Sequence, residues 1–250
     1  MAKLSDAEKI AGWHAVSAVI ERRPDAVLQL WLQEGREDGR VTELRKQASA
    51  AGIRQTSVKR ADIDREAAGL RHQGVLAWVL PLAPGNQNDL DILLDGLEEP
   101  PFLLVLDCVE DPRNLGACLR TADAAGVHAV ITPRDKTANL TAAARKAAAG
   151  AAETVPLFQV SNLARCLRDL QDRGIWLVGL AGTAQNDLYA SKLTGPLALA
   201  MGAEAVGLRR LTSELCDELV RIPMWGSVES LNVSVAAAVC IYEACRQRRP

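Results

Sequence analysis

The sequence of 250 residues is poor in aromatic side chains and in histidine. Aromatic residues make up 4% of the chain and hydrophobic residues 48%, so we expect a core built mainly from Ala, Leu and Val. The three histidines, His14, His72 and His128, are far apart in the sequence and indicate no metal cluster. A histidine-based metal site is therefore not expected.

Cysteine motifs and long apolar runs are also lacking. The six cysteines all lie between residues 108 and 245 among apolar residues, and no pair has the C-x-x-C spacing of zinc ligands. We therefore expect free thiols in a reducing compartment. No stretch approaches the roughly 20 apolar residues that span a bilayer, and the charged start MAKLSDAEKI does not resemble a signal peptide. These features predict a cytoplasmic protein without membrane contact.

What is present is an alternation of apolar strands and helical patterns, which is typical of α/β domains. The first 82 residues predict one small α/β domain. Its expected helices are 5–23, 41–51 and 61–69, and its expected strands are 26–32, 53–58 and 75–80. Prolines and glycine then break the pattern, and residues 83–99 are predicted to be a linker that holds one or two helical turns between 89 and 97.

The alternation restarts after the linker, and residues 100–250 predict a second α/β domain with a parallel sheet covered by helices. Its expected strands are 102–107, 127–132, 155–158, 175–180, 197–201 and 219–222, and its last helix is 232–247. Ligands of open α/β sheets bind beyond the carboxyl ends of the strands. Three loops in these positions are therefore candidates for a binding site.

The first loop leads from a strand into a helix and contains Asn114, Gly116 and Arg120. Asn114 is placed to cap the helix, and Arg120 lies about one and a half turns inside it. A capped helix with a solvated arginine explains these residues as well as a functional role does.

The second loop, residues 201–210, has two glycines that allow a ligand to approach the backbone, Gly202 and Gly207, with Glu204 between them. The dinucleotide pattern G-x-G-x-x-G is absent, and the acidic residue lies inside the loop instead of about 20 residues further on. The alternative is a simple turn.

The third loop, residues 222–234, runs into the last helix. Pro223 and Gly226 indicate an irregular backbone, and Ser230, Asn232 and Ser234 cluster at the helix entry. Free N–H groups at a helix start, together with hydroxyl and amide side chains, suit an anionic or carboxylate-bearing ligand. An elaborate helix cap is the alternative, although one polar residue suffices for capping.

Taken together, the three loops resemble the SpoU (TrmH) family of RNA ribose 2′-O-methyltransferases in the SPOUT superfamily. They match its N-L-G-x-x-x-R, G-x-E-x-x-G and I-P-M-x-G-x-x-x-S-L-N-V-S motifs in the family's order. The resemblance covers residues 100–250 closely. The segment Gly12-Trp-His-Ala-Val16 and the small first domain resemble the RNA substrate-binding domain of a bacterial subgroup that methylates a guanosine in the peptidyl-transferase region of 23S ribosomal RNA.

This resemblance implies a homodimer, a deep C-terminal trefoil knot and S-adenosylmethionine as the cofactor, with large-subunit ribosomal RNA as the substrate. On the matching positions, the cofactor-binding residues are Gly202, Ile222 and Leu231, with Met201 and Met224 as neighbours. The implied catalytic residues are Asn114, Arg120, Glu204, Ser230 and Asn232.

Two positions depart from the subgroup's pattern. Cys108 stands where glycine is usual, and we expect a packing adjustment there. Trp225 stands where a small residue is usual, and it is predicted to narrow the cofactor loop, to stack on a base, or to fill a surface groove.

The family's proposed base is the motif arginine, here Arg120. A guanidinium is effectively never deprotonated in proteins. Our hypothesis is that Arg120 stabilises the developing alkoxide and grips a substrate phosphate. Glu204 is expected to position loop groups or substrate, and Ser230 and Asn232 to shape the site through hydrogen bonds.

Three other functions stay open at this point. The same chemistry on transfer RNA is disfavoured by the first domain, and a non-catalytic RNA-binding assembly factor is disfavoured by the intact motif residues. A nicotinamide-dependent oxidoreductase lacks its fingerprint.

The formal net charge of −2 at first argues against RNA. Residues 86–99 alone carry −5, whereas residues 1–85 carry +2 and residues 100–250 carry +1. Two groups of cations are candidate phosphate contacts. They are Arg54, Lys59, Arg60, Arg65 and Arg71 in the first domain, and Arg209, Arg210, Arg246, Arg248 and Arg249 in the second. This distribution favours recognition of RNA shape and unpaired bases over bulk charge.

Overall fold

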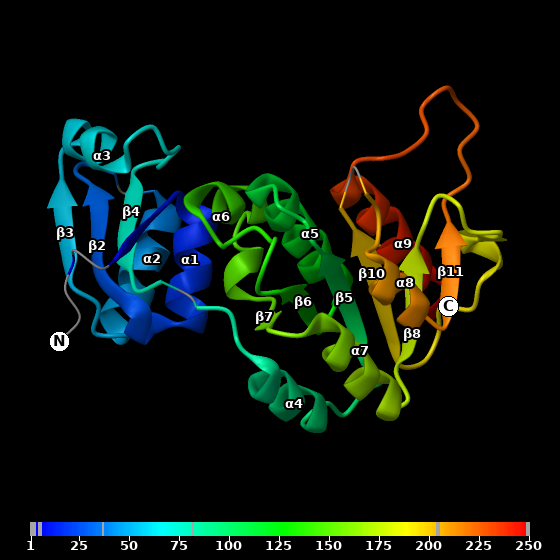
Figure 1. Cartoon of the computed structure of the whole chain (residues 1–250). Helices are drawn as coiled ribbons and strands as arrows, with labels where there is room; N and C mark the ends of the chain where they lie inside the picture. The colour runs from blue at the N-terminus through cyan, green and yellow to red at the C-terminus, as the bar shows by residue number, and fades with distance from the viewer. Residues whose placement is uncertain (1–3, 5–6, 37, 82, 204–205, 249–250) are drawn as a thin grey trace. The chain divides into compact units, whose positions relative to one another are not determined.

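The computed structural model describes residues 4, 7–36, 38–81, 83–203 and 206–248 (Figure 1). The chain divides into two compact units. The first comprises residues 1–83 with 149–154, and the second comprises residues 84–148 with 155–250. In the described part, no helix is long and apolar enough to cross a membrane.

The first unit is built on a mixed four-stranded sheet in the order β1-β4-β2-β3. Its strands are β1 (Glu8–Ala11), β2 (Val27–Gln33), β3 (Gln55–Val58) and β4 (Val75–Val79). Strand β4 pairs antiparallel with β1 and β2, whereas β2 and β3 are parallel. Because both faces of this sheet are covered by helices, β4 is buried along its whole length.

Helices α1 (Trp13–Arg22) and α2 (Gly39–Ala50) cover one face, and α3 (Arg60–Ala67) covers the other. The first core is aliphatic, and the second contains the tilted ring pair of Trp31 and Trp78, with centroids 4.6 Å apart. A short 3-10 turn, Ala151–Glu153, belongs to the same unit, and Arg23 pairs with Glu153 at 2.8 Å.

The predicted helix over 5–23 is wrong in its first half. Residues Glu8–Ala11 form β1, and the helix begins at Trp13. Gly12 separates the two elements with a φ of 93°, a left-handed backbone that favours glycine. The apolar stripe from Trp13 to Ile20 is therefore a helix signal, but it does not extend to Ile10, which is buried as a strand residue.

The segment predicted as a linker contains helix α4 (Gln87–Asp95). Asn86 and Asp89 form a capping box at its start, and Leu90 and Leu94 are buried in the core of the second unit. Two of its carboxylates, Asp91 and Asp95, pair with Arg173 at 3.2 Å and 2.5 Å. Part of the acidic cluster is thus neutralised within the unit.

The second unit contains a seven-stranded sheet in the order β7-β6-β5-β10-β8-β11-β9. Every neighbouring pair is parallel, which confirms the predicted parallel sheet. Its strands are β5 (Phe102–Asp107), β6 (Ala129–Pro133), β7 (Leu157–Val160), β8 (Trp176–Leu180), β9 (Asn186–Asp187), β10 (Leu197–Gly202) and β11 (Glu218–Arg221).

Helices cover both faces of this sheet, and the side chains of each strand alternate between the two. On one face, α4 packs with α7 (Leu163–Asp172) and α8 (Arg210–Leu215). On the other, α5 (Pro112–Ala125) packs against α6 (Ala142–Ala148) and α9 (Val233–Arg248). Gly116 lets α5 and α6 approach closely, since a Cβ there would lie 2.2 Å from the Ala144 carbonyl oxygen.

The path of the chain through the sheet positions the candidate site. Strand β10 lies between β5 and β8, and the chain then crosses to β11 beyond β8. It finally returns in α9, which packs on α5 and β10 (Figure 1). The loops after β10 and β11 are consequently brought to the start of α5.

Candidate active site

The three predicted loops meet at the carboxyl edge of the second sheet, where they follow β5, β10 and β11. Helix α5 begins at Pro112, two residues before Asn114. Its cap is Asp111, whose side chain accepts from the Arg113 N–H at 2.7 Å. The prediction that Asn114 caps this helix is therefore wrong. Proline at the first helical position is tolerated because it lacks an N–H, and this signal identifies the true start.

Asn114 instead contacts the third loop. Its Oδ1 accepts a hydrogen bond from Asn232 Nδ2 at 3.1 Å, although the two residues are 118 positions apart. Asn232 Oδ1 in turn accepts from the backbone N–H of Ser234 at 2.9 Å and from its hydroxyl at 2.6 Å. One amide thus caps α9 and ties its start to α5.

Arg120 does not join this contact. It lies six residues further along α5, which corresponds to about 9 Å of helix axis, and its side chain is exposed. Among the described residues it has no hydrogen-bond partner. The guanidinium is consequently available to a ligand or to another chain.

The second loop is tightly closed by its own backbone. Ala203 and Gly207 exchange two hydrogen bonds, at 3.1 Å and 2.8 Å, and Gly207 has a φ of 69°. A Cβ at Gly202 would lie only 1.9 Å from the Gly207 carbonyl carbon, so no side chain fits there. Met201, just before it, is buried. Glu204 lies outside the described residues.

This loop is held to β5 by an ion pair with a buried carboxylate, which the motifs did not predict. Asp107, at the end of β5, is fully buried, and its carboxylate accepts from the Arg209 backbone N–H at 3.0 Å and from Arg209 Nε at 2.6 Å. Arg209 was predicted only as a phosphate contact. The two residues are 102 positions apart, so no local pattern could reveal their pairing.

Cys108 follows Asp107 and has a φ of 62°, in the left-handed region that non-glycine residues seldom adopt. This conformation explains why glycine is usual at the position, and it replaces the expected packing adjustment with a backbone cause. Burial, together with the Asp107 carboxylate, raises the pKa of the Cys108 thiol. The thiol therefore stays protonated at neutral pH and is a poor nucleophile.

The third loop presents both apolar and polar groups. Ile222, Met224 and Leu231 are half-buried, and Ser230 is exposed. Trp225 is 89% exposed, so it fills no groove of this chain, contrary to one of the three predictions made for it. The loop projects from the sheet between β11 and α9 (Figure 1, orange to red).

A cavity of about 580 Å³ opens between the loops that follow β5, β6 and β10. Asn114 and Val233 line one side of it, next to the Asn114–Asn232 hydrogen bond. Its volume lies in the range of about 300–1,000 Å³ that is typical of small-molecule sites. A ligand-sized space therefore adjoins the predicted catalytic residues.

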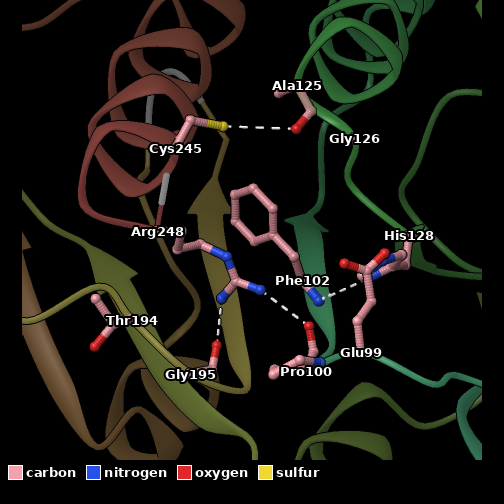
Figure 2. A pocket seen from close by; sticks show the side chains of 10 residues that line it. All are labelled: Glu99, Pro100, Phe102, Ala125, Gly126, His128, Thr194, Gly195, Cys245 and Arg248. Atoms are coloured by element: carbon pink, nitrogen blue, oxygen red, sulfur yellow. Dashed lines mark hydrogen bonds and ion pairs between the residues drawn. The ribbon is translucent and has the colours of Figure 1, made fainter. Parts of the chain in front are cut away.

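A second cavity, of about 290 Å³, lies at the opposite, amino edge of the sheet (Figure 2). Arg248, at the end of α9, stacks over the Phe102 ring at 4.8 Å and donates to the carbonyl oxygens of Gly195 and Pro100. His128 accepts from the Phe102 N–H at 2.9 Å and lies 3.0 Å from Glu99. The polar groups at this edge thus bind their own chain, and Arg248 is not available as a phosphate contact.

The six cysteines are free thiols. Burial raises the pKa of four of them, Cys118, Cys166, Cys216 and Cys240, to about 12. Within the described ranges, no group of three metal-binding side chains comes together.

The structure therefore defines a two-unit α/β protein, in which the parallel sheet of the second unit carries polar loops and a ligand-sized cavity at its carboxyl edge. The chain belongs to the SpoU rRNA Methylase family, whose profile matches residues 101–242. A second profile, described as RNA 2′-O ribose methyltransferase substrate binding, matches residues 9–84.

Curated relatives extend over the whole chain. The 23S rRNA (guanosine-2′-O-)-methyltransferase RlmB of Photorhabdus laumondii is 56% identical over 96% of this chain and 98% of its own. The enzyme of the same name from Shewanella oneidensis is 55% identical over 96% and 97%. Among solved structures, the SpoU methyltransferase AviRb from Streptomyces viridochromogenes, in complex with the cofactor AdoMet, has a TM-score of 0.78 and 27% identity, covering 97% of this chain and 91% of its own.

Proposed function

We infer that this protein uses S-adenosylmethionine to methylate the ribose 2′-hydroxyl of a guanosine in 23S ribosomal RNA. The hydrogen bond between Asn114 and Asn232 carries the inference, because it joins the first and third family motifs beside a ligand-sized cavity. The full-length identity to enzymes named for this reaction supports the choice of substrate.

The residues at the carboxyl edge fit the cofactor. Ile222, Met224 and Leu231 are apolar yet only half-buried, so a ligand with an apolar face would complete their burial. The backbone turn that Gly202 makes possible presents peptide groups at the same edge of the sheet. We assign these four residues and Met201 to cofactor binding. The bound cofactor supplies an electrophilic methyl group.

The protein's own task is to position the ribose, exclude water and handle one proton. The hydrogen bond between Asn114 and Asn232 links the starts of α5 and α9, and Asn114 lines the cavity. Ser230 adds a hydroxyl at the same loop. Arg120 stabilises the developing alkoxide and a neighbouring phosphate as a permanent cation. Glu204 is assigned to positioning.

The first domain, residues 1–82, supplies RNA affinity, and residues 83–99 connect it to the catalytic domain over 100–250. The five predicted phosphate contacts of the first domain are all exposed, and they lie in α3 or close to β3 and α3 in the sequence. Arg60 and Arg65 keep 73% of their side chains accessible, although each is near an aspartate of its own helix. Exposed cations of this kind position RNA without reading its sequence.

We also propose the C-terminal trefoil knot and the homodimer. The crossing of β10, β11 and α9 is compatible with a knot, since the chain returns past the loop that Gly202 closes.

The homodimer would form on α9. This helix exposes 49% of Val235 and 53% of Tyr242, which lie seven residues apart on one face. A second copy of the chain would cover this apolar face. Because ribosomal RNA is the proposed substrate, we also propose a cytoplasmic location.

Ribose methylation mapped in ribosomal RNA from a strain without this gene tests the function. We expect one guanosine in 23S RNA to lose its 2′-O-methyl group. Expression of the intact chain should restore it, and expression of Asn114→Ala should restore it more slowly. Unchanged ribosomal RNA together with a lost methyl group in transfer RNA would instead support the transfer-RNA alternative.

A further inference from the structure

The loop after β6 brings a strained lysine to the 580 Å³ cavity. Lys136 lines this cavity and has a φ of 55°, a left-handed conformation that is costly for a side chain with a Cβ. The loop is held there by two hydrogen bonds to the Val109 carbonyl oxygen, from Ala138 N at 2.8 Å and from Thr137 Oγ1 at 3.3 Å. Such strain persists where the surroundings fix it, and it concentrates at functional sites.

Lys136 is also a cation that the surrounding chain does not use. Of the other basic residues at the cavity, Arg209 binds the buried Asp107 and Arg210 pairs with Glu214 at 3.1 Å. Within the ranges that the structure describes, Lys136 forms neither a hydrogen bond nor an ion pair, and its side chain is exposed. Its ammonium group is therefore available to an anionic ligand at the cavity.

The rest of the cavity suits the remainder of a nucleotide. Four apolar side chains line it: Val109, Val206, Leu208 and Val233. Asn114, at one end, is bonded to Asn232 of the third motif, so a ribose at that end lies beside the proposed catalytic amides. The lining also includes two carboxylates, Glu110 and Asp111, and Asp111 accepts from the Arg113 N–H at the start of α5. The apolar side chains, the Asn114 amide and the Lys136 ammonium group complement a base, a ribose and a phosphate.

We propose that this cavity receives the target nucleotide, unstacked from the RNA, and that Lys136 binds a phosphate next to its ribose. The proposal rests on the proposed function and adds the place and the phosphate contact of the substrate nucleotide. RNA enzymes and readers commonly act on nucleotides that have left the helical stack.

Three variants test the contact. Lys136→Ala removes the cation, Lys136→Gly removes it and relieves the left-handed strain, and Arg134→Ala removes an exposed cation of the same loop that does not line the cavity. Binding of an RNA fragment that contains the target is measured by fluorescence anisotropy, and S-adenosylmethionine binding by calorimetry. We expect both Lys136 variants to lose about 10–100-fold in RNA affinity, and Arg134→Ala less than about threefold.

The Lys136→Gly variant separates contact from folding. We expect its Tm to equal or exceed that of the original chain and its cofactor affinity to stay unchanged, while RNA affinity falls. In methylation assays the loss is expected mainly in KM. Equal effects of Lys136→Ala and Arg134→Ala would overturn the proposal, because only bulk charge would then matter.

A chemical change in the RNA identifies the phosphate. A neutral methylphosphonate replaces, in turn, the phosphate on the 5′ and 3′ side of the target nucleotide. At one of the two positions it should weaken binding to the original chain by the same factor as Lys136→Ala and have no further effect on that variant. Additive losses at both positions would overturn the contact. A chain that binds this RNA with full Lys136 dependence yet never methylates it would refute the proposed function alone.

Discussion

The two edges of the second sheet differ in whether their cationic side chains all bind groups of their own chain. At the amino edge, the Arg248 guanidinium is committed to two carbonyl oxygens and an aromatic ring, and His128 bonds to β5 and Glu99 (Figure 2). At the carboxyl edge, Arg209 also binds its own chain, through Asp107, but Lys136 has no such partner in the described chain. Arg120, further along α5, has none there either. A satisfied polar group stabilises the fold, whereas an available one can bind a ligand. The difference therefore separates a structural edge from a catalytic edge.

The largest expected effect is on the chemistry that depends on Arg120. Arg120→Lys keeps the charge but loses the planar fork of donors. We expect kcat to fall by more than about a hundredfold, which corresponds to ~2.7 kcal/mol of transition-state stabilisation. Single-turnover methylation measures this loss. A near-normal kcat would mean that any cation suffices at this position.

Asn114→Ala should have the second largest effect, a loss of about 10–100-fold in kcat, because the hydrogen bond from Asn232 is lost. The double variant with Asn232→Ala should lose little more than either single variant, since the two amides act as a unit. Asn162→Ala is the control: it removes the cap of α7, which accepts from Arg165 N at 3.0 Å, and should cost about 1 kcal/mol of stability without affecting kcat.

Asp107→Asn tests the anchor of the second loop. Removing the charge that accepts two hydrogen bonds from Arg209 should lower the free energy of unfolding by about 1–3 kcal/mol. The half-exposed Arg209 can rehydrate, which limits the loss. We also expect weaker cofactor binding, because the loop that begins at Gly202 loses its tie to β5. Calorimetry that finds unchanged cofactor affinity in a destabilised variant would restrict Asp107 to a role in folding.

Arg248→Met should act on stability alone. The methionine keeps an apolar stem but loses the bonds to Gly195 and Pro100, so we expect a loss of about 1–2 kcal/mol in urea unfolding. Activity per folded molecule should stay the same. A variant of unchanged stability that loses methylation would contradict the structural interpretation of the amino edge.

The smallest effect concerns pH. Hydrogen bonds from Arg246 and Gln247 hold the pKa of the Glu243 carboxyl below its ordinary value. The contribution of a carboxylate with a lowered pKa is present above its ordinary pKa and is lost as the pH falls through the lowered value. Glu243→Gln should therefore lower Tm at neutral pH and match the original chain in strong acid. A Tm difference that is constant with pH would exclude a charge effect.

The sequence predicted the second domain better than the first. Apolar runs such as Phe102–Asp107 are buried on both faces, and such runs are typical of parallel strands. Strand β1 was missed because its four residues precede a helical stripe without a break other than Gly12. Local periodicity cannot separate short elements at such a junction.

At the site, the motif residues Asn114 and Asn232 were predicted and do meet. The partners that hold them in place were not, because Asp107 and Arg209 interact across 102 positions and leave no local signature. The left-handed backbone of Cys108 and Lys136 was equally invisible, since it is imposed by loops that converge only in the fold. Sequence patterns thus identified the chemical groups, and the fold supplied their support.

The most direct test of the carboxyl edge as a methyl-transfer site is a reaction with purified components. The chain is incubated with methyl-labelled S-adenosylmethionine and 23S ribosomal RNA from a strain that lacks the modification, and the labelled nucleosides are identified by mass spectrometry. We predict label only in 2′-O-methylguanosine, from a single site, and an initial rate of labelling about 10–100-fold lower with Asn114→Ala. Label on a nucleobase, on another ribose, or equally with Asn114→Ala would contradict the account.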